Sequence, residues 1–252
     1  MKTADVIIVG SGASGLFNAL FLPKDYKVIV ITKKEVEESD SFLAQGGISA
    51  LKNPEDYDSY FEDTMKAGHY ENDKGAVEKM IKESPQIIQD LKDFGVRFDL
   101  KDGEIEFTRE GGHSTFRILH HEDLTGKEIT SHLYEEAKKR DNITIMENCT
   151  MIDIIEKDGE CKGIVYKDAD GNLDTIEAPD TVLATGGLGG LFKHSTNFRH
   201  LTADSLAICL RHNVELENIN YIQIHPTTFY SKETRKKILN LLNQSEEREL
   251  IC

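Results

Sequence analysis

The sequence predicts an α/β fold, a Rossmann-like dinucleotide-binding domain with a parallel sheet and an antiparallel β insertion. The apolar run Val6–Val9 ends in glycines, a helical pattern follows it, and a second strand of buried type comes at 26–34. Strand, helix and strand within about thirty residues form the βαβ unit of a parallel sheet. Gly10, Gly12 and Gly15 stand in G-x-G-x-x-G spacing between that first strand and its helix.

The later elements follow from periodicity and turn residues. Residues 59–94 have helical spacing, and Gly95 is placed to end the second of two helices. The remaining expectations, in chain order, are short strands around an Asp-Gly turn at 96–112, a helix at 127–141, strands from 143 onward with hairpin turns at 157–159 and 168–171, a further buried strand at 180–183 and a helix at 202–213.

Composition excludes several classes of function. The chain has 252 residues and a net charge of -15, which argues against nucleic acid or an anionic membrane as a partner. No apolar run reaches the length that crosses a bilayer. The four cysteines lack CxxC spacing and no histidine pair has metalloprotease spacing, so we expect reduced thiols, no metal and a cytoplasmic location.

The glycine motif has a specific use at a strand-to-helix turn. The first glycine allows the tight turn, the second lets backbone approach a pyrophosphate, and the third lets helix and strand pack closely. The helix N-terminus then offers free N–H groups and a partial positive charge to the phosphates. An ordinary βα turn is the alternative interpretation, but the flanking strands favour dinucleotide binding.

Two further loops extend this hypothesis. The acidic residue that usually ends the second strand in NAD-binding proteins is absent, and Thr32, Lys33 and Lys34 stand there instead. A polar, glycine-ended loop at 39–47 and the glycines at 183–187 follow later strands. Three glycine-rich loops that follow strands of one sheet are better explained by the binding of an extended dinucleotide than by three unrelated turns.

At this point the chain resembles a known family. The motifs GSGASG, AQGGISA, TREGGHS, RILHHEDLTG, LATGG and IHPTTFY occur in the order found in the L-aspartate oxidase family. That family belongs to the FAD superfamily that includes the succinate dehydrogenase and fumarate reductase flavoproteins. The resemblance implies a flavoenzyme that oxidises L-aspartate to iminoaspartate in NAD biosynthesis. It implies oxygen or fumarate as electron acceptor and quinolinate synthase as the consumer of the product.

The resemblance also implies roles for single residues. Asp40 stands where the succinate and fumarate enzymes carry the histidine joined covalently to flavin, so FAD is expected to be non-covalent. Glu110 matches the residue near the substrate amine, and a carboxylate there suits an ammonium group. His225 matches the histidine that contacts a substrate carboxylate. A solvated loop glutamate and a structural strand-end histidine are the respective alternatives.

For the cofactor, the resemblance implies a larger set of contacts. The positions are Gly10, Ser11, Gly12, Ala13, Ser14, Gly15, Lys33, Asp40, Ser41, Phe42, Leu43, Ala44, Gln45, Gly46, Gly47, Thr150, Met151, Thr185, Gly186 and Asp204. Lys33 could balance pyrophosphate charge or be merely solvated. The family's glycines around this aspartate are Ala203 and Ser205 here, and Phe198 replaces a usual proline. If those glycines adopt positive φ, the substitutions strain the site.

The C-terminal stretch departs from the family. We expect residues 1–227 to form the N-terminal portion of an FAD-binding domain and 228–252 to be the start of a cap region or an out-of-frame tail. One permitted back-translation of 242–252, shifted by two bases, encodes ESVRGEGAYL, which resembles the family's cap motif. A natural charged helix is the alternative. The family's catalytic arginine is absent, so the fold is expected to be incomplete and the chain weakly active or inactive.

Two other functions remain open at this stage. A fumarate reductase-like or succinate dehydrogenase-like flavoprotein would share the same motifs, although Glu110 argues against it. A non-catalytic FAD-binding module would hold the cofactor without turnover. Activity of an intact version on fumarate but not on L-aspartate would favour the first, and a folded chain that holds FAD without turnover would favour the second.

Overall fold

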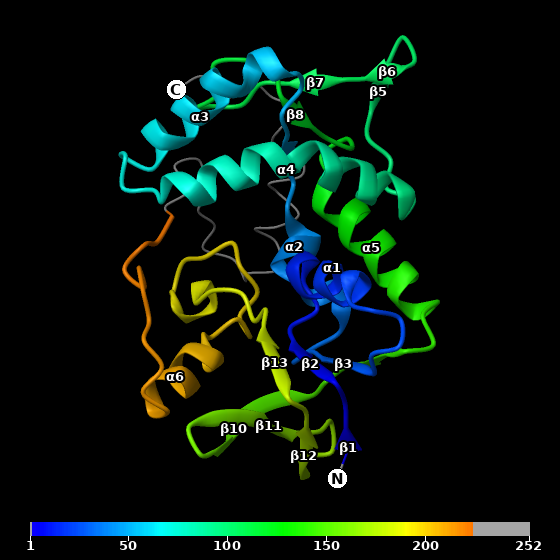
Figure 1. Ribbon diagram of the computed structural model, residues 1–252, viewed down its shortest axis with the longest axis vertical. Coiled ribbons are helices and arrows are strands. Elements are labelled where there is room, and N and C mark those ends of the chain that lie inside the picture. Colours follow the sequence, from blue (N-terminus) through cyan, green and yellow to red (C-terminus); the bar gives the residue numbers. More distant parts are fainter. Residues whose placement is uncertain (1, 224–252) are drawn as a thin grey trace. The chain divides into compact units, whose positions relative to one another are not determined.

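The computed structural model describes residues 2–223, so His225 and the segment 228–252 lie outside the described residues. The chain divides into two compact units, Met1–Gly186 and Gly187–Cys252. The first unit carries the four sheets found in the described residues, two of them four-stranded, and the helices α1 to α5 (Figure 1).

The parallel sheet of the first unit has the strand order β13–β2–β3–β9. Its strands are β2 (Val6–Val9), β3 (Val28–Ile31), β9 (Ile143–Met146) and β13 (Asp180–Leu183). All residues of β2 and β3 are buried, because both strands lie in the centre of the sheet. Unbroken apolar runs are typical of such strands in parallel sheets that are covered on both faces. The predicted βαβ unit is confirmed.

The expectation that 180–183 forms a buried strand was wrong. β13 pairs only with β2 in this sheet and is its edge strand. Its two end residues are exposed and its two central residues are half-buried. An edge strand has a neighbour on one side only, so an apolar pattern does not by itself report how deeply such a strand is covered.

The antiparallel insertion follows β9 and forms a second sheet of order β1–β12–β11–β10. Its strands are β1 (Lys2–Thr3), β10 (Thr150–Lys157), β11 (Glu160–Lys167) and β12 (Leu173–Glu177). The predicted hairpin turn is confirmed, since Asp158 and Gly159 adopt φ of 58° and 79° between β10 and β11. This sheet lies next to β13, the edge strand of the parallel sheet, which β11 contacts (Figure 1).

The helices of the first unit are α1 (Ala13–Phe21), α2 (Asp40–Leu43), α3 (Tyr57–Ala67), α4 (Lys74–Asp93) and α5 (Thr125–Lys138). Among them, α1 and α5 pack on the parallel sheet. α1 and α5 lie side by side, and α4 crosses above them (Figure 1). Leu16, Leu91 and Leu133 meet in the main apolar core that these helices share. Gly95 has φ of 95° just after α4, which confirms the predicted helix stop.

Short strands connect these helices. β4 (Ile48–Ser49), β8 (Ile118–Leu119) and β7 (Phe107–Thr108) form a small antiparallel sheet, and β5 (Leu100–Lys101) pairs with β6 (Glu104–Ile105) around the predicted Asp-Gly turn. The 3₁₀ turns of this unit are Val36–Glu38 and Pro54–Asp56. The small sheet carries the chain from the loop at 44–47 to the loop at 109–117.

In the second unit, the described residues form the 3₁₀ turn Gly189–Leu191 and helix α6 (Asp204–Arg211). The predicted helix at 202–213 is thereby confirmed. Between these elements the backbone N–H of Gly190 donates to the carbonyl of Leu201 over 2.8 Å. This bond closes the loop that leads into α6.

Candidate functional site

The predicted glycine turn lies at the carboxyl edge of the parallel sheet. Gly10 has φ of 115°, and a Cβ placed on it would lie 2.1 Å from the carbonyl oxygen of Ala184. A Cβ on Gly15 would lie 1.9 Å from the carbonyl oxygen of Gly10. The first and third glycines therefore allow β2, α1 and the end of β13 to approach to backbone contact, which confirms their predicted packing roles.

The loop at 39–47 reaches the N-terminus of α1. Ser41 Oγ accepts the backbone N–H of Ala13 over 3.0 Å, and a Cβ on Gly12 would lie 2.9 Å from the same oxygen. The first turn of α1 contains only uncharged residues. No acidic side chain therefore offsets the partial positive charge of the helix N-terminus, which faces this loop. The two segments predicted to contact a cofactor are thus brought together although they lie about thirty positions apart.

The ends of β3 and β9 add to the same edge. Ser11 Oγ donates to Thr32 Oγ1 over 2.8 Å, and both side chains are buried. The N–H of Cys149 donates to the carbonyl of Thr32 over 2.9 Å, which places the start of β10, Thr150 and buried Met151, next to the second strand's end. Lys33 follows Thr32 and is half-buried.

Glu110 is held against the second glycine loop. Its Oε1 accepts the backbone N–H of Gly47 over 3.3 Å, and a Cβ on Gly46 would lie 3.3 Å from the same atom. A Cβ on Gly47 would lie 2.3 Å from the carbonyl oxygen of Leu119, so this glycine is needed for the loop to pack on β8. The exposed Glu110 therefore lies at the loop predicted to approach the cofactor, and its role near a substrate amine stays a prediction.

Sequence reasoning missed the role of Gly126 at the start of α5. Its N–H donates to the carbonyl of Ala44 over 2.8 Å, and a Cβ on it would lie 2.1 Å from the carbonyl oxygen of Ser41. α5 thereby supports the underside of the 39–47 loop. The available signal was the Thr-Gly pair that opens a helix inside the motif RILHHEDLTG.

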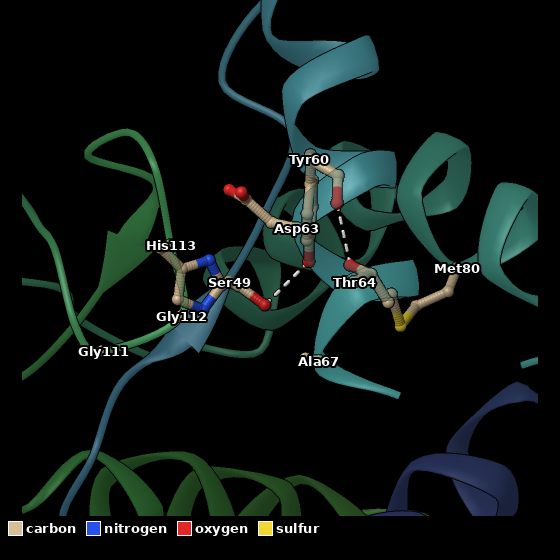
Figure 2. A pocket seen from close by; sticks show the side chains of 9 residues that line it. All are labelled: Ser49, Tyr60, Asp63, Thr64, Ala67, Met80, Gly111, Gly112 and His113. Carbon is tan, nitrogen blue, oxygen red and sulfur yellow. Dashed lines mark hydrogen bonds between the residues drawn. The ribbon is translucent and has the colours of Figure 1, made fainter. Parts of the chain in front are cut away.

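A cavity of about 240 Å³ lies between α3 and the loop that follows β7 (Figure 2). It is lined by Ser49, Tyr60, Asp63, Thr64, Ala67, Met80, Gly111, Gly112 and His113. The Tyr60 hydroxyl donates to Ser49 Oγ over 2.7 Å, and Thr64 Oγ1 donates to the carbonyl of Tyr60 over 2.8 Å. The exposed wall of the cavity is mostly apolar, and two of the hydroxyls that line it are bonded within the protein.

Beneath this cavity lies a buried ion cluster that the sequence did not reveal. The side chain of Arg117 is 0% exposed and binds Asp56 through Nε and Nη2 over 2.9 and 2.8 Å, and Asp63 through Nη1 over 2.6 Å. The Arg117 guanidinium holds the pKa of Asp56 well below its usual range, at about 2. Burial raises the pKa of Asp63, but hydrogen bonds from Ser114 and Arg117 outweigh that effect and lower it. We call Asp56, Ser59, Asp63 and Arg117 the Arg117 cluster.

The remaining predicted positions lie at the end of β13 and in the second unit. Thr185 is half-buried and Gly186 has φ of 69°. Asp204 opens α6 and accepts a hydrogen bond from Thr202 Oγ1 over 2.8 Å. Ala203 has φ of 56° and ψ of 34°, in the left-handed region, so the expectation of strain at this replaced glycine is confirmed.

The other predicted cofactor positions lie in the two loops already described. They are Ser14 in the first turn of α1, and Asp40, Phe42 and Leu43 in α2 with Gln45 just after it. Asp40, Phe42 and Leu43 are half-buried, and Ser39 caps this short helix by accepting the N–H of Phe42 over 3.4 Å. Residues Asp40–Leu43 therefore form a capped helical turn within the 39–47 loop.

Together these features define a class of protein. At Gly10 and Gly15, backbone atoms occupy the space that a Cβ would need. The N-terminus of α1 has no acidic side chain in its first turn, and the 39–47 loop contacts this terminus at the carboxyl edge of the parallel sheet. That cradle fits the diphosphate of a dinucleotide. The family model described as "FAD binding domain" matches residues 5–247, and the chain belongs to this family of flavoproteins with FAD as its cofactor.

The curated proteins similar to this chain include L-aspartate oxidases of two Clostridium species. The chain is 44% identical over 236 residues to the L-aspartate oxidase of Clostridium perfringens, covering 94% of this chain and 54% of that protein. It is 46% identical over 234 residues to the L-aspartate oxidase of Clostridium acetobutylicum, covering 92% and 54%. The chain therefore spans about half the length of the curated relatives it matches.

Solved structures share the fold. A quinol fumarate reductase FrdA variant from E. coli superposes with a TM-score of 0.80 at 28% identity, covering 84% of this chain and 38% of that chain. Sdh1 of Mycobacterium smegmatis in complex with UQ1 superposes with a TM-score of 0.76 at 31% identity, covering 84% and 39%. Within residues 2–223 we find no helix with the length and apolarity that spanning a bilayer requires.

Proposed function

We propose that this chain is the flavin-binding part of an L-aspartate oxidase, which converts L-aspartate to iminoaspartate in NAD biosynthesis. Oxygen or fumarate would reoxidise the flavin, quinolinate synthase would take the product, and the protein would work in the cytoplasm. The 44–46% identity to two L-aspartate oxidases over most of this chain supports the proposal. The carboxylate of Glu110 beside Gly47 is the observation that carries it.

FAD would be bound non-covalently in the cradle already described, since Asp40 stands at the position of the covalent histidine. Bound FAD supplies a hydride acceptor. The residues proposed to hold it are Gly10–Gly15 at the α1 N-terminus, Lys33 after β3, Asp40–Gly47 in the second loop, Thr150 and Met151, Thr185 and Gly186, and Asp204 in the second unit. The partial positive charge at the N-terminus of α1 would balance the phosphate charge.

Glu110 and His225 would bind substrate. L-aspartate differs from succinate by one ammonium group, and a carboxylate is the natural partner for an ammonium in a partly closed site. Glu110 is held in place by the Gly47 N–H, so its charge is presented at a fixed point on the loop. The role of His225, a contact to a substrate carboxylate, stays a prediction because this residue lies outside the described part of the chain.

A fumarate reductase-like activity is the second candidate. The TM-score of 0.80 to a quinol fumarate reductase favours the shared fold, and the same cradle would serve either reaction. Glu110 distinguishes the two, because a dicarboxylate without an amine gains nothing from a third carboxylate and is repelled by it. A module that binds FAD without turnover is the third.

Titration of the purified chain with FAD, followed by anaerobic addition of L-aspartate, tests the proposal. We expect saturable FAD binding and, in keeping with the weak activity expected of this chain, a slow L-aspartate-dependent loss of the oxidised flavin's visible absorbance, with a slower response to succinate. Binding without any response to either acid would favour the module. A response to succinate that exceeds the response to L-aspartate would favour the fumarate reductase-like candidate.

A further inference from the structure

The guanidinium of Arg117 is bound on all three of its nitrogens. Nε and Nη2 bind the two carboxylate oxygens of Asp56, Nη1 binds Asp63, and Nη2 also donates to Ser59 Oγ over 2.8 Å. The group lies 4.8 Å from the centre of the Tyr60 ring. Planar, two-point binding of this kind fixes orientation as well as distance, which a lysine cannot do.

The same two carboxylates also hold the loop that follows β7. Asp63 Oδ2 accepts both the backbone N–H and the Oγ of Ser114, each over 2.7 Å. Asp56 Oδ1 accepts Thr115 Oγ1 over 2.7 Å. Because Asp56 is the N-cap residue of α3 and Asp63 lies within that helix, seven hydrogen bonds tie residues 114–117 to α3.

The tied loop carries Glu110 only a few residues away. Gly111 and Gly112 lie between Glu110 and His113, and Gly112 has φ of 87°. The N–H of His113 donates to the carbonyl of Glu110 over 3.3 Å, which closes the turn. Two glycines impose little conformational preference of their own. The position of Glu110 is therefore set by its two anchors, the bond to Gly47 on one side and the Arg117 cluster on the other.

Arg117 also fixes the tautomer of His113. Arg117 Nη1 lies 3.1 Å from His113 Nδ1. A guanidinium can only donate, so Nδ1 must accept and the proton of the neutral ring must be on Nε2. His113 lines the cavity together with Ser49 (Figure 2). A neutral donor is thereby presented at the cavity wall.

We propose that Arg117 is a positioning residue for substrate recognition: it holds the loop that carries His113 at the cavity wall and Glu110 beside Gly47, so that an amino acid with a side-chain carboxylate is bound by its ammonium and by a neutral donor. Arg117 does not touch the substrate. The inference rests on the proposed function for the identity of the ligand, but its structural part, the orientation of His113 and the loop, can be tested alone.

The test compares Arg117→Lys with Arg97→Lys, an exposed arginine of the same unit, as the matched control. Far-UV circular dichroism and FAD titration establish folding and cofactor binding. The half-saturating L-aspartate concentration for anaerobic flavin reduction is measured, with succinate as the comparison ligand. Nitrogen-15 spectra of labelled histidine report the tautomer of His113, whose signal is identified by its loss in His113→Gln.

For Arg117→Lys we expect the FAD affinity to stay within about twofold of that of the unchanged protein. The half-saturating L-aspartate concentration should rise about tenfold, which corresponds to the loss of one charge-assisted hydrogen bond to the substrate. The response to succinate should change less, and His113 should lose its single Nε2–H tautomer. An unchanged L-aspartate dependence together with an unchanged His113 signal would overturn the inference. An equal loss of FAD binding and of L-aspartate response would also overturn it, since that pattern indicates a structural role only.

Two further outcomes are distinguished. If Arg117→Lys does not fold, Ser114→Ala combined with Thr115→Val loosens the same loop while leaving Arg117 paired, and the same selective loss for L-aspartate is expected. If the unchanged protein binds FAD but does not respond to L-aspartate, the proposed function fails. The positioning role of Arg117 is then decided by the His113 tautomer in the variant.

Discussion

The replacement Asp56→Asn tests the energetic weight of the Arg117 cluster through its dependence on pH. Asp56 is 8% exposed and its pKa is lowered from 3.8 to about 2 by the hydrogen bonds of Arg117. A carboxyl group whose folded-state pKa is lowered stabilises the fold above its unfolded-state pKa. That contribution is lost as the pH falls through the folded-state value. The relevant window is therefore from about pH 4 down to about pH 2.

The magnitude follows from the shift. A difference of about two pKa units corresponds to about 2.5 kcal/mol of unfolding free energy. Asp63 still neutralises Arg117 after this replacement, so no unpaired buried charge is left. We expect Asp56→Asn to be less stable than the unchanged protein by about 2.5 kcal/mol at neutral pH, and the gap to narrow by about 2 kcal/mol as Asp56 of the unchanged protein becomes protonated.

The assay is urea unfolding followed by far-UV circular dichroism at several pH values between neutrality and about pH 2. Asp58→Asn, an exposed position on the same helix, is the matched control and should change the free energy of unfolding by less than about 0.5 kcal/mol. Parallel pH profiles for Asp56→Asn and the unchanged protein would refute the reasoning, because they would mean that Asp56 does not titrate differently in the folded state.

Three further replacements test the cradle and the second unit. Gly15→Ala should cost about 3 kcal/mol and abolish FAD binding, since its Cβ would lie 1.9 Å from a backbone oxygen, whereas Gly75→Ala should stay within about 1 kcal/mol by urea unfolding. Gly126→Ala should weaken FAD affinity about tenfold in a fluorescence titration, because the 39–47 loop loses its support from α5. Ala203→Gly should raise the free energy of unfolding by up to about 1 kcal/mol by relieving left-handed strain, and a loss of stability would contradict that reasoning.

Much of the sheet could be predicted because its signals are local. β2 and β3 are short apolar runs bounded by turn residues, and burial on both faces requires just such runs. The glycine positions were equally accessible, since each removes a Cβ that backbone would otherwise meet. β13 was misjudged because the same apolar pattern occurs in central and edge strands, and only the pairing of strands distinguishes them.

The Arg117 cluster could not be predicted, because its members have no sequence relation. Arg117 and Asp56 lie 61 positions apart and meet only when α3 packs against the small sheet of β4, β7 and β8. An arginine within the apolar run FRILH would ordinarily be assigned to the exposed face of an edge strand. Its complete burial is possible only because two carboxylates and a hydroxyl satisfy the guanidinium.

This arrangement couples the stability of the first unit to the geometry of the proposed substrate site. The carboxylates that neutralise Arg117 are also the groups that anchor residues 114–117, so neither function can be altered without the other. Glu110 itself is exposed and held by a single bond of 3.3 Å, which is weak by itself. Its placement must therefore be supplied by the buried cluster behind it. Substitutions in α3 should consequently change recognition at Glu110 although they contact neither FAD nor substrate.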